Sequence, residues 1–270
     1  MIKKIISQEE LLSREASMSA MALGHGLTQL RKYDFGQTGY FYSSLLQITT
    51  GIERLLKLII IYTHRIDHNK FPDNKELRKY GHDIKVLFLK SIEIASRNDC
   101  GDIAKIFSED EIFEKIITLL SDFAMQARYY NLDVLTGRHQ KNIIEPLVRW
   151  ETEINSIIVK RHFRRRKRTL ENWEMVINAL ESKTAVRHTS EDGTPLNSFR
   201  EMAEQGMKVS TKQKYSMYYV YVIIRYLTKL LIYLEDKGSF FPFLQEYFVI
   251  YRDEDRSEIL RKKSWNPLQP

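Results

Sequence analysis

The residues with the clearest chemical potential are the basic ones between positions 160 and 168. Lys160–Arg168 reads KRHFRRRKR and contains seven lysines or arginines and no acidic residue. On a helix these charges would point in all directions, which is costly unless a polyanion or a partner's acidic residues lie alongside. We therefore expect contact with a nucleic acid or an acidic protein, the alternative being a solvated helix end. The candidate contact residues are Lys160, Arg161, Arg164, Arg165, Arg166, Lys167 and Arg168.

A second group of charges lies in the middle of an otherwise apolar stretch. Glu53 precedes Lys57 by four residues, the order that favours an ion pair along a helix, and Arg54 lies between them. One interpretation places these three side chains in a polar groove with His82 and Arg128, where they would bind a ligand. The other, which we favour, is a structural ion pair that tethers a neighbouring helix, because buried charges are normally paired.

Two further sites combine ionisable residues with a predicted helix end. His82 and Asp83 form either an acid–base pair or, as we favour, a helix start in which the acid sits at the positive end of the helix. Arg128, Tyr129 and Asp133 surround another helix end. An arginine and an aspartate in such a position can grip a phosphate. A pair of Arg128 and Asp133 that only locks the turn is an equal alternative.

Several classes of site lack the residues they need. Cys100 is the only cysteine, which excludes an intrachain disulfide and a zinc site made of several cysteines. The seven histidines contain no HExxH or HxH pattern, and no acidic cluster has the spacing of a calcium loop. A P-loop and a GxSxG motif are also absent. We expect neither a metal nor a cofactor, and we interpret Glu151 and Glu153 as solvated surface charges.

The composition indicates the cellular location of the protein. The 270 residues are 43% hydrophobic and 29% charged, as in an ordinary soluble protein, and the formal net charge is +7. The basic block accounts for this excess, so the rest of the chain is close to neutral. The longest uncharged apolar run, Tyr215–Ile224, is about half of the ~20 residues that a membrane span needs. We expect a cytoplasmic protein that does not contact a membrane.

The element that must position these residues is Tyr40–His64. Its apolar residues recur every three or four positions and widen almost to a full circumference, as in a helix surrounded by other helices. We predict that it is the central helix of a bundle. Ser108 and Glu111 predict a capping box at the start of one neighbouring helix. The neighbouring helices are predicted over Leu11–Arg31, Ile84–Ser96, Ile112–Tyr130 and Thr211–Glu235.

The basic block is predicted to lie within one long helix that begins at Ile143 and continues to Leu180. The polar stretch 181–204 contains EDGTP and predicts a surface linker. The fold class is therefore all-α. Residues 1–180 form a helical bundle with the long basic helix, and residues 205–270 form a C-terminal helical extension packed on it.

Three short segments occur in a characteristic order: LLQITTGIERLLKLIII (45–61), YGHDIKVLF (80–88) and ARYYNLD (127–133). Together they resemble the central helix, the His-Asp-Leu helix start and the Arg-Tyr helix end of the HEPN superfamily (higher eukaryote and prokaryote nucleotide-binding domains). The resemblance covers about residues 37–158. It implies an HEPN-like antiparallel bundle of four or five helices that commonly dimerises. It also implies company with toxin–antitoxin, RNA-processing and phage-defence systems.

The ribonuclease motif of that family is missing from this chain. The motif reads Arg-x4-6-His, in which the arginine holds the phosphate and the histidine assists attack by the ribose hydroxyl. Arg78 and His82 have only three residues between them, and Arg128 has no histidine until His139. The sequence therefore resembles the non-catalytic branch, a binding component of a bacterial RNA-directed or defence system that contacts nucleic acid, RNA before DNA, or a nucleotide.

Two alternatives stay open. One is a divergent, metal-independent ribonuclease whose site forms at a dimer interface from Arg128, His82 and the basic block. The other is a structural subunit that docks on an acidic partner. A homodimer is expected in either case, from the resemblance and from the aromatic stripe of Tyr215–Leu234, which exceeds the needs of a small core.

Overall fold

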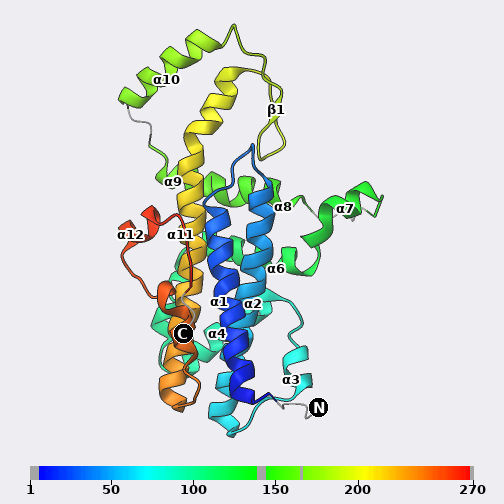
Figure 1. Ribbon diagram of the computed structural model, residues 1–270, viewed down its shortest axis with the longest axis vertical. Coiled ribbons are helices and arrows are strands. Elements are labelled where there is room, and N and C mark those ends of the chain that lie inside the picture. Colours follow the sequence, from blue (N-terminus) through cyan, green and yellow to red (C-terminus); the bar gives the residue numbers. More distant parts are fainter. Residues whose placement is uncertain (1–5, 139–143, 165–166, 268–270) are drawn as a thin grey trace.

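The computed structural model describes residues 6–138, 144–164 and 167–267. Over these residues the chain is a helical bundle with one short β-hairpin (Figure 1), which confirms the predicted all-α class. The helices are α1 (Gln8–Leu30), α2 (Gly39–His68), α3 (Asn74–Arg78), α4 (Ile84–Arg97), η1 (Gly101–Ala104), α5 (Ile106–Glu109), α6 (Glu111–Met125), η2 (Ala127–Tyr129), α7 (Tyr130–Leu135), α8 (Pro146–Arg149), η3 (Trp150–Asn155), α9 (Ser156–His162), α10 (Lys167–Leu180), α11 (Phe199–Gly238), η4 (Leu244–Tyr251) and α12 (Arg256–Arg261). Of these, η3 is a π-helix and the other η elements are 3-10 helices. The strands β1 (His188–Thr189) and β2 (Pro195–Leu196) pair antiparallel.

The central helix predicted from the apolar stripe is α2. Most of its stripe residues are completely or almost completely buried, while Ile60 and Ile61 are partly buried against the core. α2 contacts α1, α4, α6 and α11. α1 and α2 run antiparallel and side by side (Figure 1). They approach closely at Gly26, where a Cβ atom would lie 2.5 Å from Cγ1 and 3.0 Å from the backbone nitrogen of Ile48. Glycine at this position therefore lets the two helices pack backbone to backbone.

The second long core element is α11, whose 40 residues span about 60 Å. It lies inside the bundle, against α1, α2, α6 and α9, and one hydrophobic core extends from Leu12 to Trp265. The region predicted as a C-terminal helical extension packed on the bundle thus supplies α11 to this core. α11 also begins at Phe199, earlier than predicted, because Ser198 and Glu201 form a capping box. Residues 181–204 thus hold the hairpin and the start of α11 rather than only a linker.

α11 is the one helix in the described part of the chain that is long and apolar enough to cross a membrane by length and composition. Within the bundle, 72% of its apolar window is buried. Packing against α1 and α2 thus accounts for its apolar composition, as in the core helix of a globular protein.

The predicted continuous helix from Ile143 to Leu180 is wrong. Three successive helices, α8, η3 and α9, end at His162; Phe163 is extended, with φ −74° and ψ 125°, and α10 begins only at Lys167. An unbroken helix would place like charges three and four residues apart along the basic block, which destabilises it. The break removes that repulsion.

The region around α6 also departs from the prediction. Asp110, not Ser108, caps α6, because an Asp110 side-chain oxygen accepts from the Ile112 N–H at 3.0 Å. The Ser108 hydroxyl instead donates to the Lys105 carbonyl at 2.8 Å. α6 ends at Met125, and the chain continues through η2 into α7, which projects from the side of the bundle (Figure 1).

Candidate nucleic-acid interface and charged groove

The break in the helix divides the basic block into parts. Lys160 and Arg161 lie in the last turn of α9, and Arg164 follows in the extended segment. Arg165 and Arg166 lie outside the described residues. Lys167 and Arg168 open α10, and their side chains are also outside the described part. The block therefore does not form the ring of charges on one helix that the sequence predicts.

The Arg161 side chain forms an ion pair within the protein. Its Nη1 donates to Asp110 Oδ2 at 2.7 Å, which ties the end of α9 to the start of α6. The Asp110 carboxylate and the Tyr219 hydroxyl raise the pKa of this guanidinium above its ordinary value. Lys160 and Arg164 are exposed, and within the described residues Arg164 donates only to the neighbouring Phe163 carbonyl. These two side chains keep their charges available to a ligand.

His162 lies among these cations in an unusual environment for a histidine. Its ring stacks on the Tyr215 ring of α11, with 3.6 Å between centroids and 5° between planes, and its Nε2 lies 2.9 Å from the Tyr219 hydroxyl. Burial, reinforced by the charges of Arg256, Arg161 and Arg164, lowers the pKa of His162 to about 4. The imidazole is therefore neutral at pH 7 and serves as an aromatic ring.

Arg256 joins this cluster from the far end of the chain. It is exposed on α12, and its guanidinium lies 5.7 Å from the Tyr215 ring centroid and 5.2 Å from that of Tyr218. Figure 1 shows α12 beside α11, on the same side of the bundle as the end of α9. We call the resulting surface the basic–aromatic patch, and it consists of Lys160, Arg161, His162, Arg164, Tyr215, Tyr218 and Arg256.

Sequence analysis did not identify Arg256 as part of this surface, because acidic residues surround it in the sequence. Two of those acids are occupied elsewhere in the structure. Glu254 pairs with Lys229, and Asp255 caps α12 by accepting from the Ser257 and Glu258 N–H groups. The charges along this segment indicate a neutral or acidic surface. In the fold, however, Arg256 lies beside the basic block.

A charged groove of about 500 Å³ lies elsewhere, along α2. The five residues of the predicted polar groove line it, namely Glu53, Arg54, Lys57, His82 and Arg128. They come from three separate segments: α2, the loop before α4, and η2. The packing of α2 therefore brings together side chains that lie far apart in the sequence.

Within the charged groove, most charges are paired. Lys57 Nζ lies 2.7 Å from Glu53 Oε1, as the i, i+4 spacing predicted, and His82 Nδ1 lies 2.9 Å from the same oxygen. Arg54 pairs with Glu15 of α1. Among the described residues, no ion pair or side-chain hydrogen bond holds Arg128, which is exposed. Arg128 is thus the cation of this groove best placed to receive an anion.

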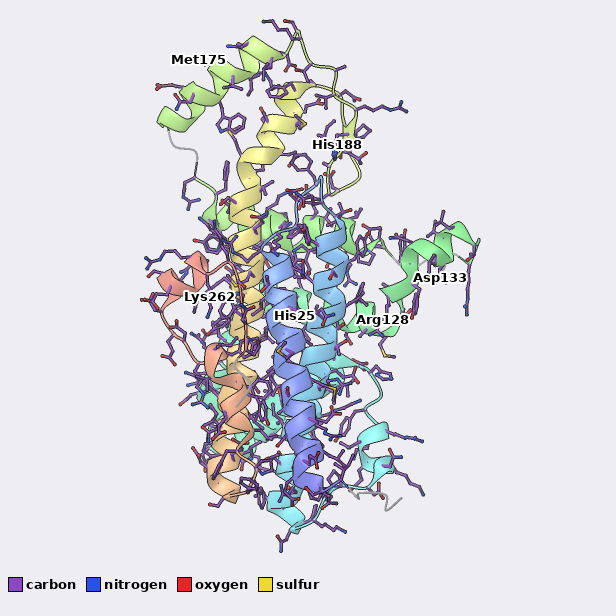
Figure 2. All side chains as sticks on the ribbon, viewed as in Figure 1. His25, Arg128, Asp133, Met175, His188 and Lys262 are labelled. Carbon is purple, nitrogen blue, oxygen red and sulfur yellow. The ribbon has the colours of Figure 1, made fainter. Side chains whose placement is uncertain are left out.

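The remaining predicted residues do not line the charged groove. Asp83 caps α4 by accepting from the Val86 N–H at 3.0 Å, so the capping interpretation is confirmed. Tyr129 is 62% exposed, and Asp133 lies on the projecting α7. Figure 2 shows Arg128 where the chain leaves the bundle and Asp133 farther out. No ion pair between Arg128 and Asp133 occurs in this described region, so the turn is not locked in that way.

A buried polar cluster was missed at the sequence level. Lys212 of α11, only 2% exposed, has its Nζ 2.6 Å from Glu151 Oε1 and 3.3 Å from Glu191 Oε2. Glu151 lies in the π-helix η3. Because its side chain is only 17% exposed and pairs with this buried lysine, its interpretation as a solvated charge is wrong. Asn155, one turn further along η3, donates to Glu151 and to the Tyr33 hydroxyl, both at 2.7 Å. Lys212 lies in the polar first half of α11, between Lys208 and Lys214, so the local sequence carried no signal that it is buried.

Among the described residues, no group of three His, Cys, Asp or Glu side chains is arranged to hold a metal ion. Comparison of the chain with family models, with curated proteins and with solved structures finds no match. The two candidate sites are therefore interpreted from their own chemistry.

Proposed function

We propose that the protein binds single-stranded nucleic acid, RNA before DNA, at the basic–aromatic patch, as an HEPN-like binding component of a bacterial RNA-directed or defence system. One observation carries the proposal. Arg256, remote in sequence, converges with Arg161 and Arg164 on the stacked rings of His162 and Tyr215. Cations from two distant segments around one aromatic stack are a recurrent arrangement for binding a nucleic-acid strand.

The charges of the patch suit a phosphate backbone. Exposed Lys160, Arg164 and Arg256 can each contact a phosphate, and a guanidinium does so through paired N–H donors. Because His162 is neutral at pH 7, it adds no repulsion between these cations. Binding should release counterions and weaken steeply with salt, by a slope of about 0.7 for each phosphate contact with a single strand.

The aromatic part of the patch favours a single strand over a duplex. Unpaired bases can stack on exposed rings and on the plane of an arginine, whereas duplex bases are already stacked. Tyr215 and Tyr218 are half-buried rings with Arg256 over them. The preference for RNA over DNA and the bacterial defence context rest on the resemblance of residues 37–158 to the HEPN superfamily.

Fluorescence anisotropy with a short single-stranded RNA, the matching DNA strand and a DNA duplex tests this proposal. The triple variant Lys160→Gln, Arg164→Gln and Arg256→Gln should flatten the salt slope by about two units and lower RNA affinity at low salt. A matched control removes three exposed lysines at the other end of the bundle, with Lys70→Gln, Lys75→Gln and Lys79→Gln. The control should retain most of the affinity.

Absence of RNA binding at low salt, or equal losses in both triple variants, would overturn the proposal. Salt-sensitive binding to an acidic protein without binding to RNA or DNA would instead support the docking of an acidic partner. Tighter binding to the duplex than to either single strand would leave a charge-only interface with no role for the rings.

A second candidate function is metal-independent RNA cleavage in the charged groove. The specific observation is that Glu53 holds Nδ1 of His82 at 2.9 Å, while the His82 side chain is 71% exposed and Arg128 lines the same groove. A carboxylate fixes the tautomer of an imidazole, which can then act as a base, and an arginine can hold the phosphate. This arrangement lies within one chain rather than at the predicted dimer interface.

We nevertheless expect no efficient cleavage, because the spacing of the family's ribonuclease motif is missing. The purified protein is incubated with labelled RNA in the presence of a chelator, alongside His82→Ala and Arg128→Ala. Cleavage that both substitutions abolish, and that a 2′-deoxy substrate resists, would contradict this expectation and establish the enzyme. Cleavage unaffected by His82→Ala would point to a contaminant.

A further inference from the structure

A short apolar arm projects from the bundle at the end of α6. We define the α7 arm as Tyr129–Leu135. Three of its apolar side chains are strongly exposed: Tyr129 is 62%, Leu132 59% and Leu135 81% exposed. Their spacing of three places neighbouring members on the same side of a helix. A clustered apolar surface on a projecting element is typical of a protein contact rather than of a free surface.

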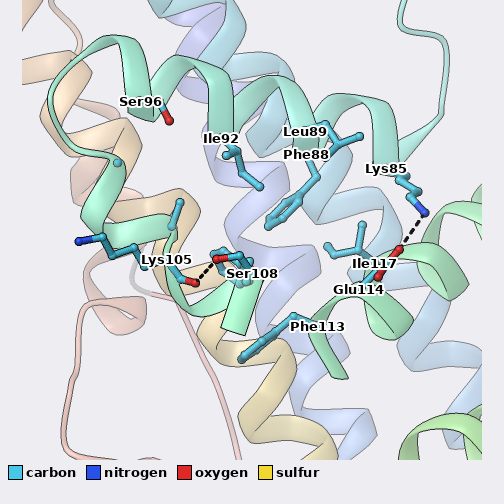
Figure 3. Close-up of a pocket in the computed structure, with 13 residues that line it drawn as sticks. Lys85, Phe88, Leu89, Ile92, Ser96, Lys105, Ser108, Phe113, Glu114 and Ile117 are labelled. Atoms are coloured by element: carbon cyan, nitrogen blue, oxygen red, sulfur yellow. Dashed lines mark hydrogen bonds and ion pairs between the residues drawn. The ribbon is translucent and has the colours of Figure 1, made fainter. Parts of the chain in front are cut away.

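An apolar groove is present elsewhere on the same chain. We define the α4–α6 groove as the cavity of about 420 Å³ between α4, η1, α5 and α6. Figure 3 shows Phe88, Leu89 and Ile92 of α4 facing Phe113 and Ile117 of α6 across it. Leu89 is 56% exposed, so the groove opens to solvent. Its size matches cavities that enclose small ligands or a few side chains.

The polar groups around the groove already have partners. Lys85 pairs with Glu114 across the rim, and the Ser108 hydroxyl donates to the Lys105 carbonyl (Figure 3). The Lys105 side chain pairs with Asp102. A small polar ligand would need convergent polar groups to fix its orientation. The floor instead offers aromatic and aliphatic carbon, which fits an apolar protein segment.

The arm of the same chain is not placed to fill this groove. The residues Phe113, Glu114 and Ile117 line the groove in the first half of α6, whereas the arm leaves at the other end of that helix. The 15 residues of α6 separate its ends by about 22 Å. Figure 1 shows the arm pointing away from the bundle. An arm can therefore reach a groove only in a second copy of the chain.

We propose that two copies of the protein form a symmetric dimer in which each α7 arm inserts into the α4–α6 groove of the other. The charges agree with this pairing. Asp133 on the arm and Arg138 just beyond it carry charges opposite to those of Lys85 and Glu114, which form an ion pair on the groove rim, so the arm can exchange partners with that pair. Because the contact is reciprocal, one arm and one groove per chain give a closed two-fold dimer.

This surface differs from the one that the sequence suggested. The aromatic stripe of Tyr215–Leu234 is largely buried within the chain by α1, α2, α6 and α9, so it offers little surface to a second copy. The arm-exchange dimer uses surfaces that the chain leaves uncovered. It is also independent of nucleic-acid binding at the basic–aromatic patch.

Sedimentation analysis of the wild type and of two exposed-site variants tests the proposal. The wild type should be dimeric in the tens of micromolar. Leu135→Glu in the arm and Leu89→Glu in the groove should each raise the dimer dissociation constant by at least about 30-fold, the effect expected for a central contact residue. Met175→Glu is the matched control, because Met175 is 72% exposed on α10, another projecting helix (Figure 2), and should not change the constant.

Mixing the two variants gives the sharpest outcome. A heterodimer of Leu135→Glu with Leu89→Glu retains one intact arm and one intact groove, so the mixture should dimerise better than either variant alone. Circular dichroism spectra with the helical content of the wild type will show that each variant folds. A monomeric wild type, a dimer that ignores both substitutions, or a mixture no better than its components would overturn the proposal.

Discussion

His162 couples packing and electrostatics within one side chain. It stacks on Tyr215 and lies among three arginines, and burial is the first cause of its lowered pKa. Because His162 stays neutral, it adds no positive charge to that of the surrounding arginines. A nucleic acid bound to these arginines would relieve their repulsion and favour the protonated imidazole.

Stability should fall as pH is lowered through the range that His162 titrates. Its pKa is about 4 when folded against 6.5 when unfolded, so between these values the unfolded chain binds more protons. The stabilising contribution is complete above pH 6.5 and is lost on approach to pH 4. Because the ring is partly exposed, we expect about 1–2 kcal/mol. Urea denaturation of the wild type and of His162→Phe, which keeps an aromatic ring, should show a steeper acid loss in the wild type. Parallel curves would contradict the assignment.

At the scale of elements, the π-helix η3 positions a buried charged cluster. The wider turn carries Glu151 and Asn155 toward α11, where Glu151 meets Lys212. The hairpin supplies Glu191, whose second carboxylate oxygen, Oε1, has no hydrogen-bond partner in the described part of the chain, and burial raises the pKa of Glu191. Three elements that are separate in sequence are therefore joined through one lysine.

Removing that lysine should be far more costly than neutralising the hairpin acid. Lys212→Met leaves the buried Glu191 carboxylate and the partly buried Glu151 carboxylate without a cation and should cost about 3–5 kcal/mol of unfolding free energy. Glu191→Gln leaves the Lys212–Glu151 pair balanced and should cost less than about 1 kcal/mol. Chemical denaturation at pH 7 measures both values. Equal losses would show that Glu191, rather than Glu151, is the main partner of Lys212.

At the scale of the whole molecule, one core holds two candidate sites apart. The basic–aromatic patch lies where α9, α11 and α12 meet, and the charged groove lies along α2 below the projecting α7 (Figure 1). The segment from α8 to α9 crosses between these sides of the bundle. Separate substitutions can therefore test the proposed RNA binding at the patch and the cleavage considered for the groove.

Much of the architecture followed from the sequence because it depends on local pattern. The apolar period of 40–64 predicted a buried central helix, the Glu53–Lys57 spacing predicted an ion pair, and Asp83 predicted a helix cap. Each of these depends on residues within about one turn of one another. The all-α class followed from the same periodicity.

Tertiary structure decided the features that depend on distant residues. Arg256 joins the basic block only because α12 packs beside α11, and no spacing along the chain encodes that contact. The basic helix breaks after His162, where Arg161 meets Asp110 of another helix. Lys212 is buried because two acids from other elements surround it. Local propensity does not depend on residues that are distant in the sequence. Whether these charges repel or pair is therefore decided only in the folded chain.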